Sequence, residues 1–181
     1  MKMLHLLRHA KSSWAAPQLS DHARELNDRG RRDAPRMGRA LATILEPQVI
    51  HCSSAMRARS TLEGLCDGWP AMARQEHVIV DALYTFEWRE LLAWLQDHPD
   101  EAAACFLIGH NPALTDLCNQ LVGRAALDNL PTAGYLQLSI PVASWRDVAG
   151  GIASLEAWQF PKDLPKDLPN DPSEELPRSP D

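Results

Sequence analysis

Residues 4–10 read Leu4-His5-Leu6-Leu7-Arg8-His9-Ala10, an apolar, strand-like run that ends in an arginine and a histidine. In α/β proteins, chemistry gathers outside the carboxyl ends of the parallel strands. Because a guanidinium stays protonated, the imidazole beside it is poorly placed to bind a cation and well placed to meet a phosphate. This stretch therefore predicts an anion site at one edge of a sheet.

Two later strand-like runs also end in polar residues. Residues 104–109 lead into His110, and residues 49–52 lead through a serine-rich turn to Arg57. A parallel sheet would gather Arg8, His9, Arg57 and His110 at a single edge. One histidine at a strand end is more often structural than catalytic, so the prediction depends on the four residues together.

The rest of the chain alternates between helical and strand-like segments. Helices are predicted after Asn27, whose side chain would cap the first turn, after Arg57 as far as Asp67-Gly68-Trp69-Pro70, and over residues 88–97 and 112–122. Strands are predicted at residues 78–80, 104–108, 136–140 and 153–160, and a polar loop over 11–26. This alternation predicts an α/β three-layer sandwich, with helices flanking a mostly parallel central sheet.

The first predicted helix contains a proline. Helical spacing turns Ala34, Met37, Leu41 and Leu45 toward the core, but Pro35 lies among them. An interior proline costs a straight helix about 3 kcal/mol, so we expect a kink or a late helix start at this point.

Length and composition limit the kind of protein. The 181 residues, 45% of them hydrophobic, suit one globular domain, and the net charge of −6 argues against nucleic acid as a partner. No apolar run approaches the ~20 residues of a membrane span. The chain also shows no signal peptide before its first strand, so we expect no membrane association and a cytoplasmic location.

The four cysteines predict neither a disulfide framework nor a metal site. They form no C-x-x-C pair, and three of them lie in apolar segments, which is typical of buried thiols; they are Cys52, Cys66, Cys105 and Cys118. Cys52 and Arg57 resemble the ends of a Cys-x5-Arg phosphatase loop. Only four residues separate them, so a thiolate mechanism is not predicted.

Residues 161–181 differ in kind from the rest of the chain. They contain six of the fourteen prolines, a tandem Pro-Lys-Asp-Leu repeat and more acids than bases. Such a segment buries too little apolar surface to order itself. We therefore expect one catalytic domain over residues 1–160 and a disordered, solvated tail over 161–181.

The polar motifs resemble those of the histidine phosphatase superfamily, whose fold is phosphoglycerate-mutase-like, and in particular its small phosphohistidine phosphatase branch. The resemblance spans roughly residues 3–160 and depends on Arg8-His9, the serine-rich turn before Arg57, and Gly109-His110-Asn111-Pro112. It implies that Arg8, Arg57, His110 and Asn111 contact the substrate, that His9 is the nucleophile, and that no cofactor or metal takes part.

The chemistry of phosphoryl transfer is consistent with these roles. Displacement at phosphorus needs an in-line nucleophile and positive donors around the equatorial oxygens. Neutral His9 can attack and form a phosphohistidine that water then hydrolyses. Arg8 and Arg57 offer planar forks, and His110 would be a third clamp if protonated beside a dianion. For each residue alone, a structural role is the better interpretation: Arg57 would cap a strand or pair with a surface acid, and His110 would close a turn. For the four residues together, the phosphate site is the better interpretation.

The segment Leu83-Tyr84-Thr85-Phe86-Glu87 has a threonine where phosphoester-hydrolysing members of the family have a carboxylate. An alkoxide leaves badly without a proton, whereas a phosphorylated imidazole leaves through a nitrogen that can be protonated near neutral pH. The sequence therefore favours phosphohistidine, on a phosphotransfer protein of signal transduction, as the substrate. Glu87 is a candidate acid, although it also suits the start of a helix.

Two other functions stay open: a small-molecule phosphomonoesterase of the same fold, and a non-catalytic phosphate-binding module. Trp14 could form a rim for a protein substrate or pack in the core. An arginine-rich stretch could dock an acidic phosphoprotein or form a solvated helix face; its members are Arg24, Arg29, Arg31, Arg32, Arg36 and Arg39.

Overall fold

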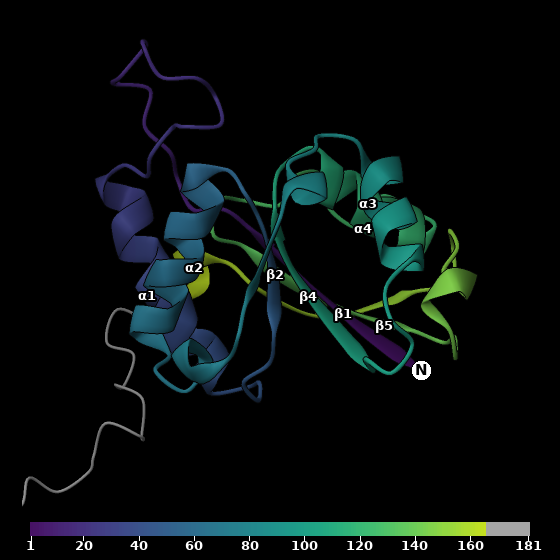
Figure 1. Ribbon diagram of the computed structural model, residues 1–181. Coiled ribbons are helices and arrows are strands. Elements are labelled where there is room, and N and C mark those ends of the chain that lie inside the picture. Colours follow the sequence, from purple (N-terminus) through teal and green to yellow (C-terminus); the bar gives the residue numbers. More distant parts are fainter. Residues whose placement is uncertain (166–181) are drawn as a thin grey trace, which may run out of the picture.

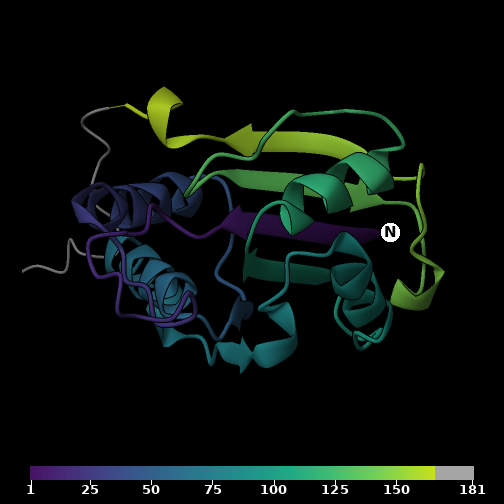
Figure 2. The same cartoon turned by 90° about the horizontal axis from the view of Figure 1, so that it is seen from above.

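A six-stranded sheet in the order β3-β2-β4-β1-β5-β6 forms the middle of the molecule in a computed structural model that describes residues 1–165. Its strands are β1 Lys2–Arg8, β2 Ile50–Ser53, β3 Val78–Val80, β4 Ala104–Gly109, β5 Tyr135–Ile140 and β6 Ser154–Gln159. β1, β2, β3 and β4 are parallel, and β5 pairs antiparallel with both β1 and β6. Figure 2 shows β6, β5, β1 and β4 side by side, from the yellow edge inward. The predicted mostly parallel sheet is confirmed.

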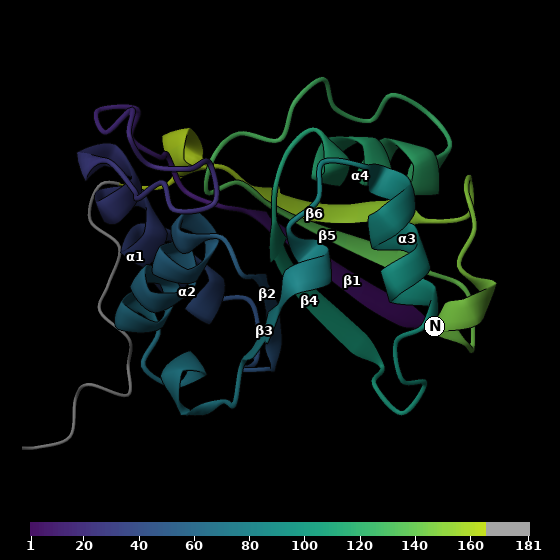
Figure 3. The same cartoon turned by 45° about the horizontal axis from the view of Figure 1, so that its top comes forward.

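Helices cover both faces of this sheet. α1 Asp28–Ala42 and α2 Met56–Gly68 lie on one side, and α3 Trp88–Gln96 and α4 Ala113–Val122 on the other (Figures 1 and 3). Short 3-10 helices occupy Met72–Arg74, Asp81–Leu83, Trp145–Asp147 and Pro161–Asp163. The predicted α/β three-layer sandwich is therefore confirmed.

Two hydrophobic cores lie on the two faces of the sheet, because successive strand residues point to opposite sides. In β1, Leu4 and Leu6 join the core under α3 and α4, whereas Leu7 joins the core under α1 and α2. All three leucines are fully buried. Both faces of β1 are buried, so the strand places Arg8 and His9 at the sheet edge on a rigid support.

α1 begins as predicted and continues through its proline. The Asn27 side chain accepts a hydrogen bond from the Gly30 amide at 2.9 Å, which confirms the cap. The helix is continuous from Asp28 to Ala42, so the alternative of a late start at Pro35 is wrong. Burial of the apolar face of α1 outweighs the free-energy cost of an interior proline. Leu45 lies beyond the helix end and is only partly buried.

The domain extends past residue 160, which corrects the predicted boundary. Pro161 is buried, and Leu164 packs into the core under α1 and α2. Arg36 also donates from Nη2 to the Leu164 carbonyl at 3.3 Å. The apolar side chains at the start of the proline-rich segment thus join an existing core. The remainder of the predicted tail, residues 166–181, lies outside the described residues.

The cysteines are free thiols, as predicted. Cys52, Cys105 and Cys118 are buried, and Cys66 is partly buried. Burial raises the pKa of Cys52 to about 12, so this thiol is a poor nucleophile.

Among residues 1–165, no helix has the length and apolar character needed to cross a bilayer.

Candidate active site

The predicted quartet meets at the carboxyl ends of three strands. Arg8 is the last residue of β1, His9 follows it, His110 follows β4, and Arg57 lies in the first turn of α2, just after β2. The rings of His9 and His110 lie 5.1 Å apart, centroid to centroid. Arg57 Nε lies 3.3 Å from His9 Nε2. The structure therefore brings the four residues together, and their catalytic roles remain predictions.

The backbone holds His9 in one tautomer, which leaves its Nε2 without a hydrogen. Its Nδ1 lies 2.7 Å from the carbonyl oxygen of Ala10, and because a carbonyl only accepts, Nδ1 carries the hydrogen. The Ala10 amide donates in turn to the Thr61 hydroxyl at 2.8 Å, which fixes this turn against α2. Burial, reinforced by the Arg57 and Arg8 charges, lowers the pKa of His9 to about 3. Nε2 therefore presents a lone pair at neutral pH.

Arg57 links His9 to an acid that the sequence did not point to. Its side chain is buried, and Nη1 and Nη2 donate to the Asp21 carbonyl at 2.5 Å and the Asp21 carboxylate at 2.9 Å. Arg57 thus pairs with an acid and also lies beside His9, and its contact with substrate remains a prediction. Burial of Asp21 opposes ionisation, but hydrogen bonds from Tyr84 and Arg57 lower its pKa to about 2.

Arg8 has a donor left without a partner. Its Nη1 donates to the Leu130 carbonyl at 2.8 Å, while its buried Nε makes no hydrogen bond within the described residues. Burial, followed by the Arg57 charge, lowers the pKa of Arg8. Buried donors are almost always satisfied, so an acceptor such as a phosphate oxygen is the expected partner.

His110 is neutral in the free site. Burial, with contributions from His9 and Arg57, lowers its pKa to about 2. Its Nε2 lies 2.7 Å from the Ser53 hydroxyl, and its buried Nδ1 has no partner among the described residues. When Ser53 donates to Nε2, Nδ1 carries a hydrogen that it can give to a phosphate oxygen. The expected protonated clamp would require a dianion to raise this pKa.

Asn111 lies at the site but is committed to the protein. Its amide nitrogen donates to Asn129 Oδ1 at 2.9 Å and to the Leu130 carbonyl at 3.0 Å. The remaining oxygen is an acceptor and a poor partner for a phosphate. In this arrangement Asn111 holds the loop that also receives Arg8, so the structure does not support a direct phosphate contact.

A pocket of about 200 Å³ is lined by Arg8, His9 and Arg57 but not by His110. Its charged lining is mostly positive, and we call it the phosphate pocket after the ligand that this lining predicts. Trp14 forms part of its rim, since this side chain is 74% exposed. The Arg24 guanidinium lies 3.4 Å from the centre of the Trp14 ring. The alternative of a core tryptophan is therefore wrong. The lining residues are Arg8, His9, Lys11, Ser12, Trp14, Asp21, Arg24, Arg57, Phe86, Asn111 and Thr132.

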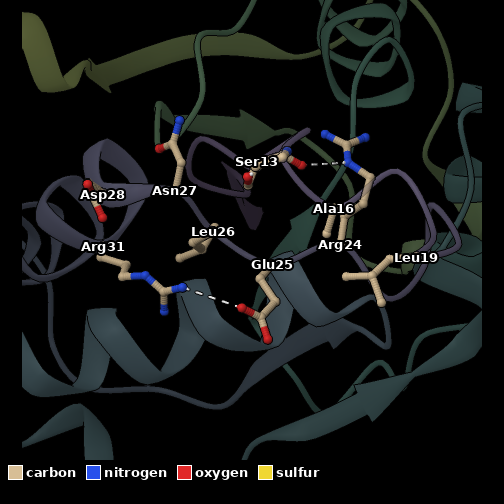
Figure 4. Close-up of a pocket in the computed structure, with 10 residues that line it drawn as sticks. Ser13, Ala16, Leu19, Arg24, Glu25, Leu26, Asn27, Asp28 and Arg31 are labelled. Carbon is tan, nitrogen blue, oxygen red and sulfur yellow. Dashed lines mark hydrogen bonds and ion pairs between the residues drawn. The ribbon is translucent and has the colours of Figure 1, made fainter.

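A second pocket, of about 400 Å³, adjoins the first through Arg24 (Figure 4). Arg24 donates from Nε to the Ser13 carbonyl at 3.2 Å, and Arg31 pairs with Glu25 at 3.5 Å across the same pocket. Arg29 also pairs with an acid on α1. Arg24 is thus the arginine of this stretch that reaches the phosphate pocket, and docking of a phosphoprotein here remains a prediction.

Glu87, the candidate acid, does not line the phosphate pocket. It is the residue before α3. There the Thr85 hydroxyl accepts a hydrogen bond from the Glu87 amide at 3.1 Å and donates one to the Glu90 carboxylate. The carboxylate that lines the pocket belongs to Asp21, and its low pKa keeps it ionised. Within residues 1–165, the pocket therefore contains no carboxylic acid that is protonated at neutral pH.

Sequence reasoning missed several supporting residues. Ser53 lies in the serine-rich turn, so its position was visible although its contact with His110 was not. Asp21 lies in a polar loop without periodicity, and Thr61 and Tyr84 carry no local signal of their contacts. All four act through partners that are distant in the chain.

The comparisons identify the class of protein to which this fold and site belong. A sequence profile of the histidine phosphatase superfamily (branch 1) matches residues 4–107, more than half of the chain. The chain belongs to this superfamily. An uncharacterized protein of Mycobacterium leprae is 27% identical over 168 residues, covering 86% of this chain and all of the relative.

Two solved structures illustrate the range of similar proteins. A candidate phosphohistidine phosphatase SixA from Nakamurella multipartitia superposes with a TM-score of 0.72 at 26% identity, covering 88% of this chain and 96% of the other. A mycobacterial glucosyl-3-phosphoglycerate phosphatase superposes with a TM-score of 0.62 at 16% identity, covering 87% and 98%. The second likeness shows the fold alone.

Proposed function

We propose that the protein is a metal-independent phosphohistidine phosphatase that works through a phosphohistidine intermediate on His9. One observation supports this most directly: a neutral His9 faces cationic donors in a pocket whose lining carboxylate stays ionised. Such a pocket suits a leaving group that needs no strong acid. The substrate would be a phosphohistidine-bearing phosphotransfer protein in the cytoplasm.

The reaction would proceed in two displacements. Nε2 of His9 forms a bond to phosphorus as the substrate N–P bond breaks, and the departing imidazole nitrogen takes a proton from water. Arg57 Nε, now 3.3 Å from Nε2, would turn to a phosphate oxygen, joined by the unpartnered Arg8 Nε. Water then attacks phosphorus, the P–Nε2 bond breaks, and phosphate leaves with His9 again neutral.

Access to the pocket also favours a macromolecular substrate. Trp14 and Arg24 form an exposed rim, and the adjoining pocket of about 400 Å³ extends the concave surface beyond the phosphate site. The SixA-like structure at 26% identity is consistent with this substrate class. The small volume of the phosphate pocket, about 200 Å³, keeps a small phosphorylated molecule as the second candidate.

Labelling with ³²P tests the proposal. Brief exposure to a ³²P-phosphohistidine protein should place acid-labile, base-stable label on His9, and turnover should exceed that of sugar phosphates. His9→Ala should lose both label and turnover while retaining its fold and some phosphate affinity, because the arginines remain. His98→Gln, outside the pocket, serves as the matched histidine control and should label normally.

Three outcomes would contradict parts of this proposal. Label on a serine, or wild-type turnover by His9→Ala, would remove His9 as the nucleophile. Faster turnover of sugar phosphates would favour the small-molecule phosphomonoesterase. Retained phosphopeptide binding with no turnover of any substrate would favour a phosphate-binding module.

A further inference from the structure

We propose that His51, His98 and Cys105 form a binding site for one Zn²⁺ ion, separate from the catalytic pocket. The three residues offer ligand atoms that all lie within 4.8 Å of one another. None of them lines the phosphate pocket. They come from β2, from the segment after α3, and from β4.

The sheet register explains why these residues meet. β2 and β4 are parallel neighbours with His51 opposite Leu107, and Cys105 lies two residues before Leu107. Because strand side chains alternate, His51 and Cys105 point to the same face, which α3 and α4 cover. α3 ends at Gln96, so His98 emerges over this face. The separations in sequence, 47 residues and 7 residues, match no common zinc motif.

The donor set suits zinc. Zn²⁺ binds imidazole nitrogen and thiolate sulfur, and three protein ligands leave the fourth tetrahedral position for water. Donor atoms in such a tetrahedron lie roughly 3.4–3.6 Å apart. Side-chain rotations that move the ligand atoms by about 1 Å would bring them to this spacing. His51 Nδ1 is buried and makes no hydrogen bond within the described residues. Burial, with the His51 and Lys2 charges, lowers the pKa of His98 to about 4, so this ligand is neutral.

Aromatic side chains pack around the cluster. The Trp94 ring lies 5.2 Å from the His51 ring and 5.3 Å from the His98 ring, between centroids. Trp145 packs edge-on against His98 at 5.7 Å. These rings restrict the rotamers of both imidazoles. His98 also lines an open pocket of about 350 Å³, which gives an ion access from solvent.

A positive charge lies beside the cluster, so an incoming Zn²⁺ needs the thiolate form of Cys105 to offset part of its charge. Lys2 is the cation facing the site, and its ammonium donates to the Asp100 carbonyl at 2.6 Å and the Ala102 carbonyl at 3.1 Å. The Asp100 carboxylate lies 4.0 Å from it. Burial raises the pKa of Cys105, so binding must release the thiol proton to water, and affinity should rise with pH. The net gain is then one positive charge.

The proposed role is structural. An ion at this cluster would tie the end of α3 to β2 and β4. Cys105 lies five residues before His110, about 16 Å along an extended chain, so the ion would not contact the catalytic groups. Hydrolysis is therefore expected to survive removal of the ion.

Cobalt spectroscopy of the full, reduced chain tests this proposal. After treatment with a chelator, Co²⁺ should produce a thiolate-to-cobalt charge-transfer band and tetrahedral d–d bands that saturate at one equivalent. Zn²⁺ should displace the cobalt and raise Tm. Cys105→Ser should lose the charge-transfer band, whereas Cys118→Ser, an equally buried free thiol outside the cluster, should keep it.

A second variant covers the case in which Cys105→Ser fails to fold. His98 is only partly buried, so His98→Gln should fold, and it should weaken Zn²⁺ binding at least tenfold in competition with a chromophoric chelator. Absence of the thiolate band in the wild type, its persistence in Cys105→Ser, or unchanged Zn²⁺ affinity in His98→Gln would overturn the proposal. No readout uses a phosphorylated substrate, so this result is independent of the proposed activity.

Discussion

Arg57 shows how one side chain sets the ionisation state of the phosphate pocket. Its Nε meets His9, and its two terminal nitrogens hold Asp21. The same charge helps keep His9 neutral and Asp21 ionised. A planar guanidinium can make these three contacts at once, whereas an ammonium offers a single point charge. The geometry of the site therefore depends on the shape of this side chain as well as its charge.

Replacing Arg57 by lysine should lower kcat/KM roughly 10²–10³-fold, the usual cost of losing one preorganised donor to a developing charge. The charge remains, so binding of inorganic phosphate should fall much less than turnover. Steady-state kinetics and phosphate competition measure the two effects. Arg31→Lys is the control, because Arg31 pairs with Glu25 on the surface. A loss below tenfold for Arg57→Lys would contradict the role.

At the scale of elements, the structure at the start of α3 explains why this segment contributes no carboxylic acid to the phosphate pocket. Thr85 is buried, and its hydroxyl binds the Glu87 amide and the Glu90 carboxylate, so the segment is organised as a helix start. Glu87 precedes the first turn, where a negative charge favours the helix dipole. This arrangement gives Glu87 a structural role away from the phosphate pocket.

Glu87→Gln should therefore leave catalysis nearly unchanged. Without a protonated acid, activity should depend steeply on the leaving group, and p-nitrophenyl phosphate should be hydrolysed far better than an alkyl phosphate. The measurement is kcat/KM for both esters in both proteins. A drop of more than about tenfold on the alkyl ester alone would identify Glu87 as the proton donor, since general acid catalysis contributes 10²–10⁴-fold.

The packing of α1 against α2 depends on glycines. A Cβ on Gly38 would lie 2.2 Å from the Leu65 carbonyl oxygen, and one on Gly68 would lie 1.9 Å from the Pro35 carbonyl oxygen. The two backbones approach too closely for any side chain at these points. Since Arg57 lies in the first turn of α2, this contact also sets where Arg57 stands.

Gly38→Ala should destabilise the protein by about 1–3 kcal/mol, the typical cost of overpacking. Helix propensity alone would give the opposite sign, a gain of up to about 1 kcal/mol. Urea unfolding decides between them. Gly109→Ala, whose Cβ would meet Leu114 at an ordinary 3.5 Å, is the control and should change stability far less. A stabilised Gly38→Ala would refute the close approach.

At the scale of the whole molecule, neutral imidazoles are distributed through the core. Burial lowers the pKa of His5 to about 4, of His9 to about 3, of His98 to about 4 and of His110 to about 2. Their ordinary value in an unfolded chain is about 6.5. Below that pH the unfolded chain binds protons that the native protein does not.

Stability should therefore fall as the pH drops from about 6.5 toward 4. Each proton bound only by the unfolded chain contributes a slope of about 1.4 kcal/mol per pH unit. Urea unfolding at pH 7, 6 and 5 measures it, above the range in which carboxylates protonate. His98→Gln should reduce the slope, by less than a fully buried imidazole would because His98 is partly exposed. A flat profile would contradict the lowered pKa values.

The local features of this chain could be predicted from the sequence because neighbouring residues encode them. Apolar runs marked β1 and β4, helical spacing and the Asn27 cap marked α1, and the alternation of elements gave the three-layer fold. The order of Arg8, His9 and His110 after these strands followed directly. Parallel strands then bring such residues to a single edge, whatever the intervening loops contain.

Tertiary packing alone decided the contacts between distant residues, the end of the domain and the course of α1. Asp21 meets Arg57 across 36 residues and Ser53 meets His110 across 57, and His51, His98 and Cys105 converge only through the strand register. Packing also extended the domain to Leu164 and carried α1 through Pro35. These outcomes depend on burial, charge and contact between distant segments, and a local pattern contains no information about which distant segment becomes its neighbour.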